Sequence, residues 1–211
     1  MIVCHMHRLV YLAPPKTGSA NLRHLLMHEP FHGRILGEHA HHGVEWHDDF
    51  KNYFHFITVR HPFPRMYSLW RMLFNGHQRY KAAPGERSPH LWFVEYFPDN
   101  APCFDEFLDA TFLPFRDVWR CSWHLEQLPS EVPGTVVKLE SYYQDLARVP
   151  HVRDHLDSVG YFNVRSDDAP PWYEVINAAR AKKIRELWAE DFVRFGYNAT
   201  LKSAIPLFGE R

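Results

Sequence analysis

The stretch RLVYLAPPKTGSANLRHLL, residues 8–26, decides the fold of this chain. Residues 8–12 form an apolar run typical of a buried strand, and two consecutive prolines end it. In residues 19–27, apolar side chains recur at the i, i+3 and i+4 spacing of an amphipathic helix, with Ser19 placed to cap its N-terminus. A strand, a short loop and a helix in this order predict one unit of an α/β fold.

The loop of this unit has the chemistry of an anion site. A loop between a strand and a helix N-terminus presents backbone N–H groups and the positive end of the helix dipole. Lys16 adds a full charge, and Gly18 allows the backbone to approach a ligand closely. Thr17, Ser19 and Asn21 add hydrogen-bond donors. A phosphate suits such a loop best, and the alternative is an ordinary loop with a surface lysine.

A second unit follows in FITVRHPFPRMYSLW, residues 56–70. We predict a strand over residues 54–59 and a helix from about residue 64 to residues 75–76. Arg60 comes at the carboxyl end of the strand, where ligands bind in open α/β sheets. Ser68 lies on the polar side of the helix, and a guanidinium with a hydroxyl holds a phosphate well. The alternative is an arginine that only caps the sheet edge.

The rest of the chain continues the alternation of strand and helix. We predict a strand over residues 135–139, a largely helical segment over residues 141–159, and a last long helix over residues 173–195 that Gly196 ends. The pattern predicts a single α/β domain over residues 1–211, with a central parallel sheet flanked by helices. Residues 76–130 are expected to be largely irregular and to contribute to acceptor binding, or to form a solvated insertion.

Composition excludes several classes of protein. The net charge of −1 argues against a protein that coats nucleic acid. No apolar run is long enough for a membrane helix, and the first residues lack the layout of a signal peptide. Three cysteines without a CxxC motif indicate a reducing compartment, so we expect a cytoplasmic protein. Cys103 and Cys121 are expected to be buried as small apolar side chains.

Histidine is unusually frequent, with 16 residues in the chain. The segment GEHAHHGVEWHDDF, residues 37–50, holds four of them, and histidine is the usual general base near neutral pH. Exposed histidines without a role are the alternative. The same segment with Asp48 has ligands that zinc accepts, but it lacks an established spacing, and we expect no metal.

Taken together, four segments resemble the sulfotransferases that use 3′-phosphoadenosine 5′-phosphosulfate (PAPS). PPKTGSANLRHLL resembles their 5′-phosphosulfate loop, and VRHPFPRMYSLW resembles their 3′-phosphate motif, Arg-x-Pro-x-x-Arg-x-x-Ser. GTVVKLESYYQDL resembles a late strand and its Glu-containing turn. ELWAEDFVRFGY resembles the C-terminal helix of the carbohydrate and heparan-type branch. The resemblance follows the family's order and covers most of the chain outside residues 76–130.

The resemblance implies a P-loop-like sulfotransferase fold, with PAPS as the donor and 3′,5′-bisphosphoadenosine (PAP) as the product. The residues that would hold the 5′-phosphosulfate follow one another in the first loop: Lys16, Thr17, Gly18, Ser19, Ala20 and Asn21. Ala20 stands where the family often has Thr, so one hydroxyl contact would be replaced. Arg60 and Ser68 would hold the 3′-phosphate. Lys16 would also stabilise the charge on the departing phosphate.

The resemblance also suggests a base and some supporting residues. A Gly-x-His-Ala form in related enzymes favours His39 as the base, and an His-x-His form in heparan-type relatives favours His41. Arg65 matches a second family arginine, but its place equally suits a structural ion pair. Glu140 would organise its turn or an arginine near the donor, and Lys138 would approach the ligand; both also suit purely structural roles.

We therefore expect a sulfotransferase that moves a sulfuryl group to a hydroxyl of a carbohydrate or small metabolite, with no nucleic-acid partner and no membrane insertion. The first alternative is a kinase or NTPase of the P-loop class. That class needs a GxxxxGK[ST] loop, whereas here Lys16 precedes Gly18 and the earlier glycine is missing. The second alternative is a nucleotide-binding module without catalysis.

Overall fold

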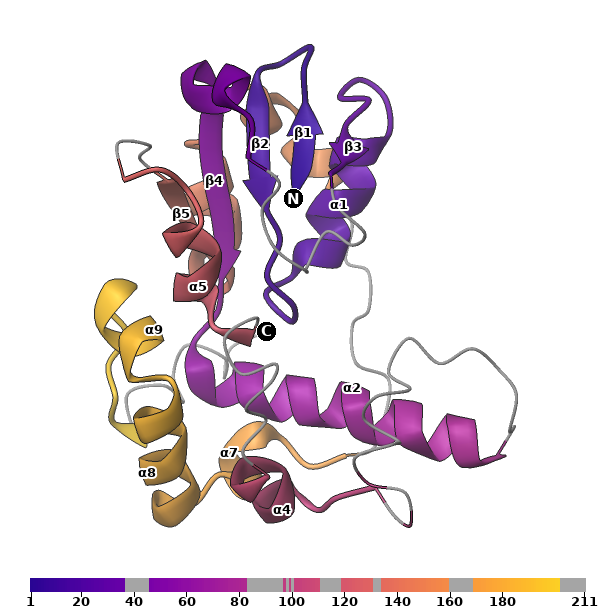
Figure 1. Cartoon of the computed structure of the whole chain (residues 1–211), viewed down its shortest axis with the longest axis vertical. Coiled ribbons are helices and arrows are strands. Elements are labelled where there is room, and N and C mark those ends of the chain that lie inside the picture. Colours follow the sequence, from indigo (N-terminus) through magenta and orange to yellow (C-terminus); the bar gives the residue numbers. More distant parts are fainter. Residues whose placement is uncertain are drawn as a thin grey trace.

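A five-stranded mixed sheet organises the described part of the chain (Figure 1). The computed structural model describes residues 1–36, 46–82, 97, 99, 101–110, 119–130, 134–159 and 169–201. The strand order is β3-β1-β2-β4-β5. The strands are β1 Ile2–Cys4, β2 Leu9–Leu12, β3 Arg34–Ile35, β4 Phe54–Val59 and β5 Gly134–Lys138.

The three predicted strands form the parallel part of this sheet. β4 pairs in parallel with β2 on one side and with β5 on the other. The predicted central parallel sheet is confirmed, and β1 and β3 extend it with antiparallel pairs at one edge. These strands are only three and two residues long. Strands of that length are too short to show an alternating apolar pattern in the sequence.

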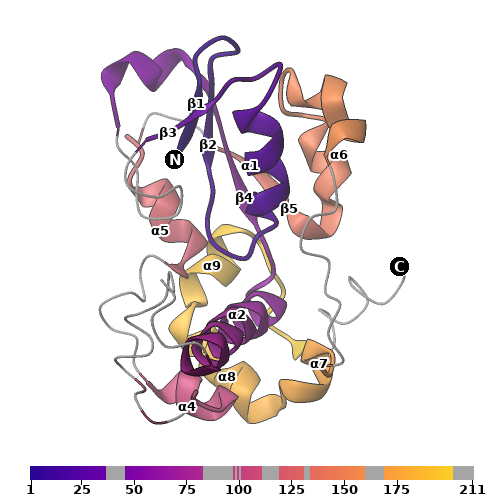
Figure 2. The same cartoon turned by 90° about the vertical axis from the view of Figure 1, so that its right-hand side faces the viewer.

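Helices cover both faces of the sheet. On one face, helix α1 (Ser19–Met27) and helix α6 (Tyr142–Leu146) pack over Leu9 and Tyr11 of β2. On the other, Val10 and Leu12 of the same strand pack in a cluster that includes Cys121 of helix α5 (Cys121–Glu126). The alternation along β2 follows from the two-residue period of a strand. Figure 2 shows α1 and α6 on one side of the sheet and α5 on the other.

A helical layer lies beyond the carboxyl ends of the parallel strands. In Figure 1 the arrows of β2 and β4 point toward α2 (Pro62–Ala82), which crosses below the sheet. Four shorter helices pack with α2 around a buried aromatic core. They are α4 (Phe104–Asp109), α7 (Trp172–Val175), α8 (Ala178–Leu187) and α9 (Ala189–Arg194).

Two predicted helix boundaries were wrong. α2 begins at Pro62 and continues past Gly76 to Ala82, because one glycine inside a helix costs only about 1 kcal/mol. The last helix is divided into α7, α8 and α9. The side chain of Asn177 accepts a hydrogen bond from the N–H of Arg180 and starts α8. Trp188, with φ −123°, separates α8 from α9. Gly196, with φ 61°, follows the end of α9 as predicted.

The segment over residues 141–159 is largely helical as predicted, and consists of the short α6 with 3₁₀ turns at Leu139–Ser141 and Val152–Ser158. Two further expectations need correction. Residues 76–130, expected to be irregular, include the end of α2 and the helices α4 and α5. Cys121 is buried as predicted, but Cys103 is exposed. The Cys103 sulfur accepts a hydrogen bond from the N–H of Glu106 and so caps α4.

Candidate functional site

Three cationic side chains come from the carboxyl ends of neighbouring parallel strands. Lys16 lies in the loop after β2, Arg60 directly follows β4, and Lys138 is the last residue of β5. The register pairs Leu12 with Ile57 and Val59 with Lys138, so these strand ends meet at one edge of the sheet. This edge is where open α/β sheets bind ligands.

The electrostatics of this edge show that the cations influence one another. Burial lowers the pKa of Lys16 from its usual value, and the positive charge of Arg60 lowers it further. Arg60 and Lys138 also lower the pKa of the neighbouring His61. The structure therefore brings the two predicted phosphate sites, at Lys16 and at Arg60, into one region. Like charges held together in this way favour an anionic ligand.

The backbone of the first loop is shaped for anion binding. Lys16 has φ 66° and Gly18 has φ 80°, and Thr17 between them has no positive φ. Alternation of backbone handedness directs successive N–H groups into one concavity. Gly18 directly precedes α1 as its N-cap. A Cβ atom on Gly18 would lie 2.7 Å from Cδ1 of Leu139, so the loop packs closely against the turn after β5.

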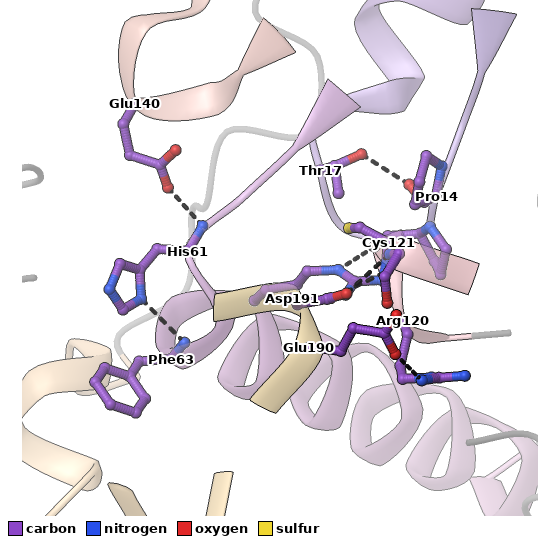
Figure 3. Close-up of polar contacts among 12 residues, drawn as sticks. Pro14, Thr17, His61, Phe63, Arg120, Cys121, Glu140, Glu190 and Asp191 are labelled. Atoms are coloured by element: carbon purple, nitrogen blue, oxygen red, sulfur yellow. Dashed lines mark hydrogen bonds and ion pairs between the residues drawn. The ribbon is translucent and has the colours of Figure 1, made fainter. Parts of the chain in front are cut away.

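The Thr17 side chain is turned into the protein. Its hydroxyl donates a hydrogen bond to the carbonyl oxygen of Pro14 at 2.8 Å, as Figure 3 shows. It also lies 2.8 Å from the hydroxyl of Thr58, which lies 2.7 Å from that of Tyr11. Thr17 is fully buried. The hydroxyl thus fixes the loop to β2 and β4, and any contact with a ligand would come from the Thr17 backbone.

The other predicted residues of the first loop lie in the first turn of α1. Ser19 is buried and is the first helical residue, so the prediction that it caps the helix was wrong. Ala20 and Asn21 are half-buried, and the N–H of Asn21 donates to the carbonyl oxygen of Gly18. The helix has no side-chain cap, which leaves the cap position to the Gly18 backbone.

The second predicted site lies on the unit formed by β4 and α2. Arg60 and Ser68 are both half-buried. Arg65, which the sequence placed either at the ligand or in an ion pair, is buried. Its guanidinium Nη1 lies 3.1 Å from Oδ2 of Asp191, and its Nε donates to the carbonyl oxygen of Pro15. The structure therefore favours the structural ion pair for Arg65.

Glu140 organises the turn that carries Arg60. Its Oε1 accepts a hydrogen bond from the N–H of His61 at 2.7 Å, as Figure 3 shows, and its Oε2 accepts one from the hydroxyl of Tyr197. The ammonium of Lys138 lies 4.8 Å from the centre of the Tyr197 ring. Glu140 thus ties the ends of β4 and β5 together.

His61 lies beside the cations but is not suited to act as a base. Burial lowers its pKa to about 4. Its Nδ1 accepts a hydrogen bond from the N–H of Phe63, so Nε2 carries the proton and donates to the carbonyl oxygen of Asn198. Both ring nitrogens are engaged in holding the β4–α2 turn and the segment after α9.

The predicted bases His39 and His41 lie outside the described residues, as does His42. His47 of the same segment is exposed and contacts the Phe50 ring. Asp48 forms an ion pair with Lys51. Within the described ranges, no group of three or more His, Cys, Asp or Glu side chains could hold a metal ion.

A family model described as the sulfotransferase family matches residues 1–198. The chain belongs to the sulfotransferase family. No curated protein and no solved structure showed a significant match. None of the helices that the structure describes is long and apolar enough to cross a membrane. The match confirms the resemblance seen in the motifs, and a sulfotransferase moves a sulfuryl group from PAPS to an acceptor and leaves PAP.

Sequence reasoning missed three supporting residues of this sulfotransferase. Asp191 lies 126 residues beyond its partner Arg65, and Tyr197 lies 57 residues beyond Glu140. Leu139 packs against Gly18 from the turn after β5. The segment ELWAEDFVRFGY contains two of the three, but its pattern indicates only a helix and its end. A lone acidic residue on the apolar side of that helix was the available signal for Asp191.

Proposed function

We propose that this sulfotransferase binds PAPS across the carboxyl ends of β2 and β4, with the phosphosulfate at Lys16 and the 3′-phosphate at Arg60. The observation that carries the proposal is that β2 and β4 pair in parallel, so that Lys16 and Arg60 follow strand ends at the same edge of the sheet, close enough for the Arg60 charge to lower the pKa of Lys16. Two cations held this close together gain from an anion between or beside them. PAPS carries anionic groups at both of its ends.

The first loop provides donors for the phosphosulfate. Lys16 contributes its ammonium, and the backbone at Thr17, Gly18 and Ser19 contributes N–H groups in front of the α1 dipole. Ala20 and Asn21 complete the proposed contacts in the first turn of α1. At the other end, Arg60 and Ser68 would hold the 3′-phosphate, and Lys138 adds a third cation at the same edge.

The reaction proposed for this site is an in-line transfer. The acceptor hydroxyl oxygen forms a bond to sulfur while the bond from sulfur to the 5′-phosphate oxygen breaks, and PAP leaves. The proton of the hydroxyl passes to a base, for which we propose His39 first and His41 second. Lys16 stabilises the negative charge that grows on the departing phosphate. This set of residues requires no metal.

We propose a hydroxyl of a carbohydrate or of a small metabolite as the acceptor. The likeness of ELWAEDFVRFGY to the carbohydrate and heparan-type branch supports the first class. Residues 76–130, which lie outside the four motifs, would contribute to acceptor binding. The three free cysteines, two of them buried, fit a reducing compartment such as the cytoplasm.

Calorimetric titration with PAP and with ATP tests the donor site. We expect the chain to bind PAP, and expect Lys16→Ala and Arg60→Ala each to weaken that binding. Transfer of labelled sulfuryl groups from PAPS to a panel of alcohols and glycans should proceed in EDTA. Preference for ATP with magnesium-dependent phosphoryl transfer would favour the P-loop kinase instead. PAP binding without transfer to any acceptor would favour the non-catalytic module.

The base requires a separate measurement. We expect His39→Ala to lower kcat by about 10²-fold or more while the affinity for PAP stays unchanged. His47→Ala is the matched control, because His47 belongs to the same segment and is exposed. Normal turnover of His39→Ala together with loss in His41→Ala would move the role to His41.

A further inference from the structure

A buried ion pair connects α2 with α9 next to the donor loop, residues 13–18 between β2 and α1. Arg65 and Asp191 are 1% and 2% exposed, and Nη1 of Arg65 lies 3.1 Å from Oδ2 of Asp191. The Asp191 carboxylate also accepts hydrogen bonds from the N–H groups of Cys121 and Ser122, at 2.9 and 2.8 Å. Figure 3 shows Asp191 beside Cys121. The carboxylate is thus held by three donors from two other elements.

The same guanidinium reaches the donor loop with a second arm. Nε of Arg65 donates to the carbonyl oxygen of Pro15 at 3.1 Å. Pro15 directly precedes Lys16, whose φ of 66° is unfavourable for a residue with a side chain. Arg65 therefore bridges the anchored Asp191 and the peptide group that sets the direction of Lys16.

Stability alone does not account for this arrangement. A buried ion pair costs much of its Coulomb energy in desolvation, and apolar replacements of similar volume are often as stable. A planar guanidinium, however, fixes two acceptors at defined directions, which an apolar cluster or an ammonium does not do. The geometry thus suits the holding of a strained loop in one conformation.

We infer that Asp191, acting through Arg65, is a positioning residue for the phosphosulfate loop of this enzyme. The inference rests on the proposed function, because it assigns the 5′ end of the donor to that loop. The pair holds the Pro15 carbonyl, and the Pro15 carbonyl holds Lys16 in its left-handed conformation with its ammonium toward the donor. Neither Arg65 nor Asp191 needs to touch the ligand.

Two ligands that differ only at the 5′ position test this inference. PAP carries both phosphates, whereas adenosine 3′-phosphate lacks the group that the loop would hold. We expect Arg65→Lys, which keeps the charge beside Asp191 but lacks the second arm, to weaken PAP binding about tenfold or more. Its affinity for adenosine 3′-phosphate should stay within about twofold of the original, and kcat should fall. Asp191→Asn should act in the same direction.

The control is Glu190→Gln, next to Asp191 on α9, because Glu190 pairs with Arg120 at the surface. It should leave both affinities unchanged. The titrations are made at a temperature at which circular dichroism shows that each variant is folded. If Asp191→Asn does not fold, the comparison is made with Arg65→Lys alone. Equal losses for both ligands, or unchanged PAP binding in Arg65→Lys, overturn the inference. Absence of PAP binding by the unmodified chain overturns the proposed function as well.

Discussion

Gly18 meets two requirements at one position. Its φ of 80° lies in the left-handed region, and a Cβ atom would lie 2.7 Å from Leu139. We expect Gly18→Ala to lower the free energy of unfolding by about 1–2 kcal/mol and to weaken PAP binding, because the backbone conformation becomes strained and the loop or the Leu139 side chain must shift. Urea unfolding and calorimetric titration measure the two effects.

Gly196 provides the matched control for this substitution. Its φ is 61°, but among the residues that the structure describes, apart from its chain neighbours, no atom lies within 4 Å of the position that a Cβ would take. Gly196→Ala should therefore lose stability from the backbone alone and should bind PAP as before. Equal PAP affinities for the two variants would contradict the role given to the contact between Gly18 and Leu139.

His61 gives the stability of the protein a defined dependence on pH. Burial lowers its pKa from 6.5 to about 4, so between these values the unfolded chain binds a proton that the folded chain does not. The free energy of unfolding therefore falls as the pH falls through this window, by about 1.4 kcal/mol per pH unit from this residue. We expect His61→Gln to make the free energy of unfolding depend less steeply on pH in this window, as measured by urea unfolding at several pH values.

The slope, and not the absolute stability, is the quantity to compare for His61. His61→Gln also changes hydrogen bonds to Phe63 and Asn198, which shifts the stability at every pH. His47→Gln, at an exposed position, should keep the original slope. An unchanged slope in His61→Gln would show that this histidine is not held neutral.

Single residues of the site were predictable where their chemistry depends on a short motif. Lys16 and Arg60 each follow a strand in a motif of a few residues, and the structure brings them together. The inward direction of the Thr17 hydroxyl was not predictable, because it depends on Thr58 in another strand. Asp191 was missed for the same reason, since its three donors lie on two other helices, α2 and α5.

The ends of β4 and β5 are coupled through Glu140. Glu140→Ala removes the acceptor of the His61 N–H and of the Tyr197 hydroxyl, and unsatisfied donors of this kind cost about 1–3 kcal/mol. Because the turn carries Arg60, we expect weaker binding of adenosine 3′-phosphate as well as of PAP. Competition titration and urea unfolding measure these losses.

Glu140→Ala should weaken the binding of both ligands, whereas Arg65→Lys should weaken the binding of PAP alone. Tyr197→Phe removes only one hydrogen bond and keeps the ring near Lys138, so it should have a smaller effect on both ligands. Glu140→Gln keeps an acceptor for His61 and should restore most of the binding. Unchanged affinity for adenosine 3′-phosphate in Glu140→Ala would contradict the role given to this turn.

Elements with a strong local pattern were predicted well. The ranges predicted for α1 and β4 agree with the structure, because prolines, glycine and apolar spacing define them locally. The last helix was predicted less well. Its apolar spacing continues across Trp188, but the helical backbone conformation is interrupted there. The short strands β1 and β3 form by pairing, β1 with β2 and β3 with β1, and no short-range sequence pattern predicts them.

At the scale of the whole molecule, the candidate site joins the sheet to the helical layer. The cations come from strand ends, and Arg65 of α2 contacts the loop that precedes α1. We expect PAP at a hundredfold excess over its dissociation constant to raise the free energy of unfolding by about 2.7 kcal/mol. Circular dichroism and tryptophan fluorescence should give one coincident transition, shifted equally.

Fluorescence reports mainly the helical layer in this experiment, although Trp46 contacts His55 of β4. Trp119, Trp172 and Trp188 lie in the aromatic core around α2, away from the strands. An ATP control should shift neither signal. A PAP-dependent shift in circular dichroism without a matching shift in fluorescence would show that the two layers unfold separately.

The stiffness of the donor loop has a kinetic consequence. Pro14 and Pro15 have restricted backbones, the Thr17 hydroxyl bonds to the first of these prolines, and Arg65 bonds to the second. A ligand arriving at such a loop has no segment to order, so association should follow a single exponential without a slow rearrangement. Its rate constant should decline as added sodium chloride screens the cationic edge.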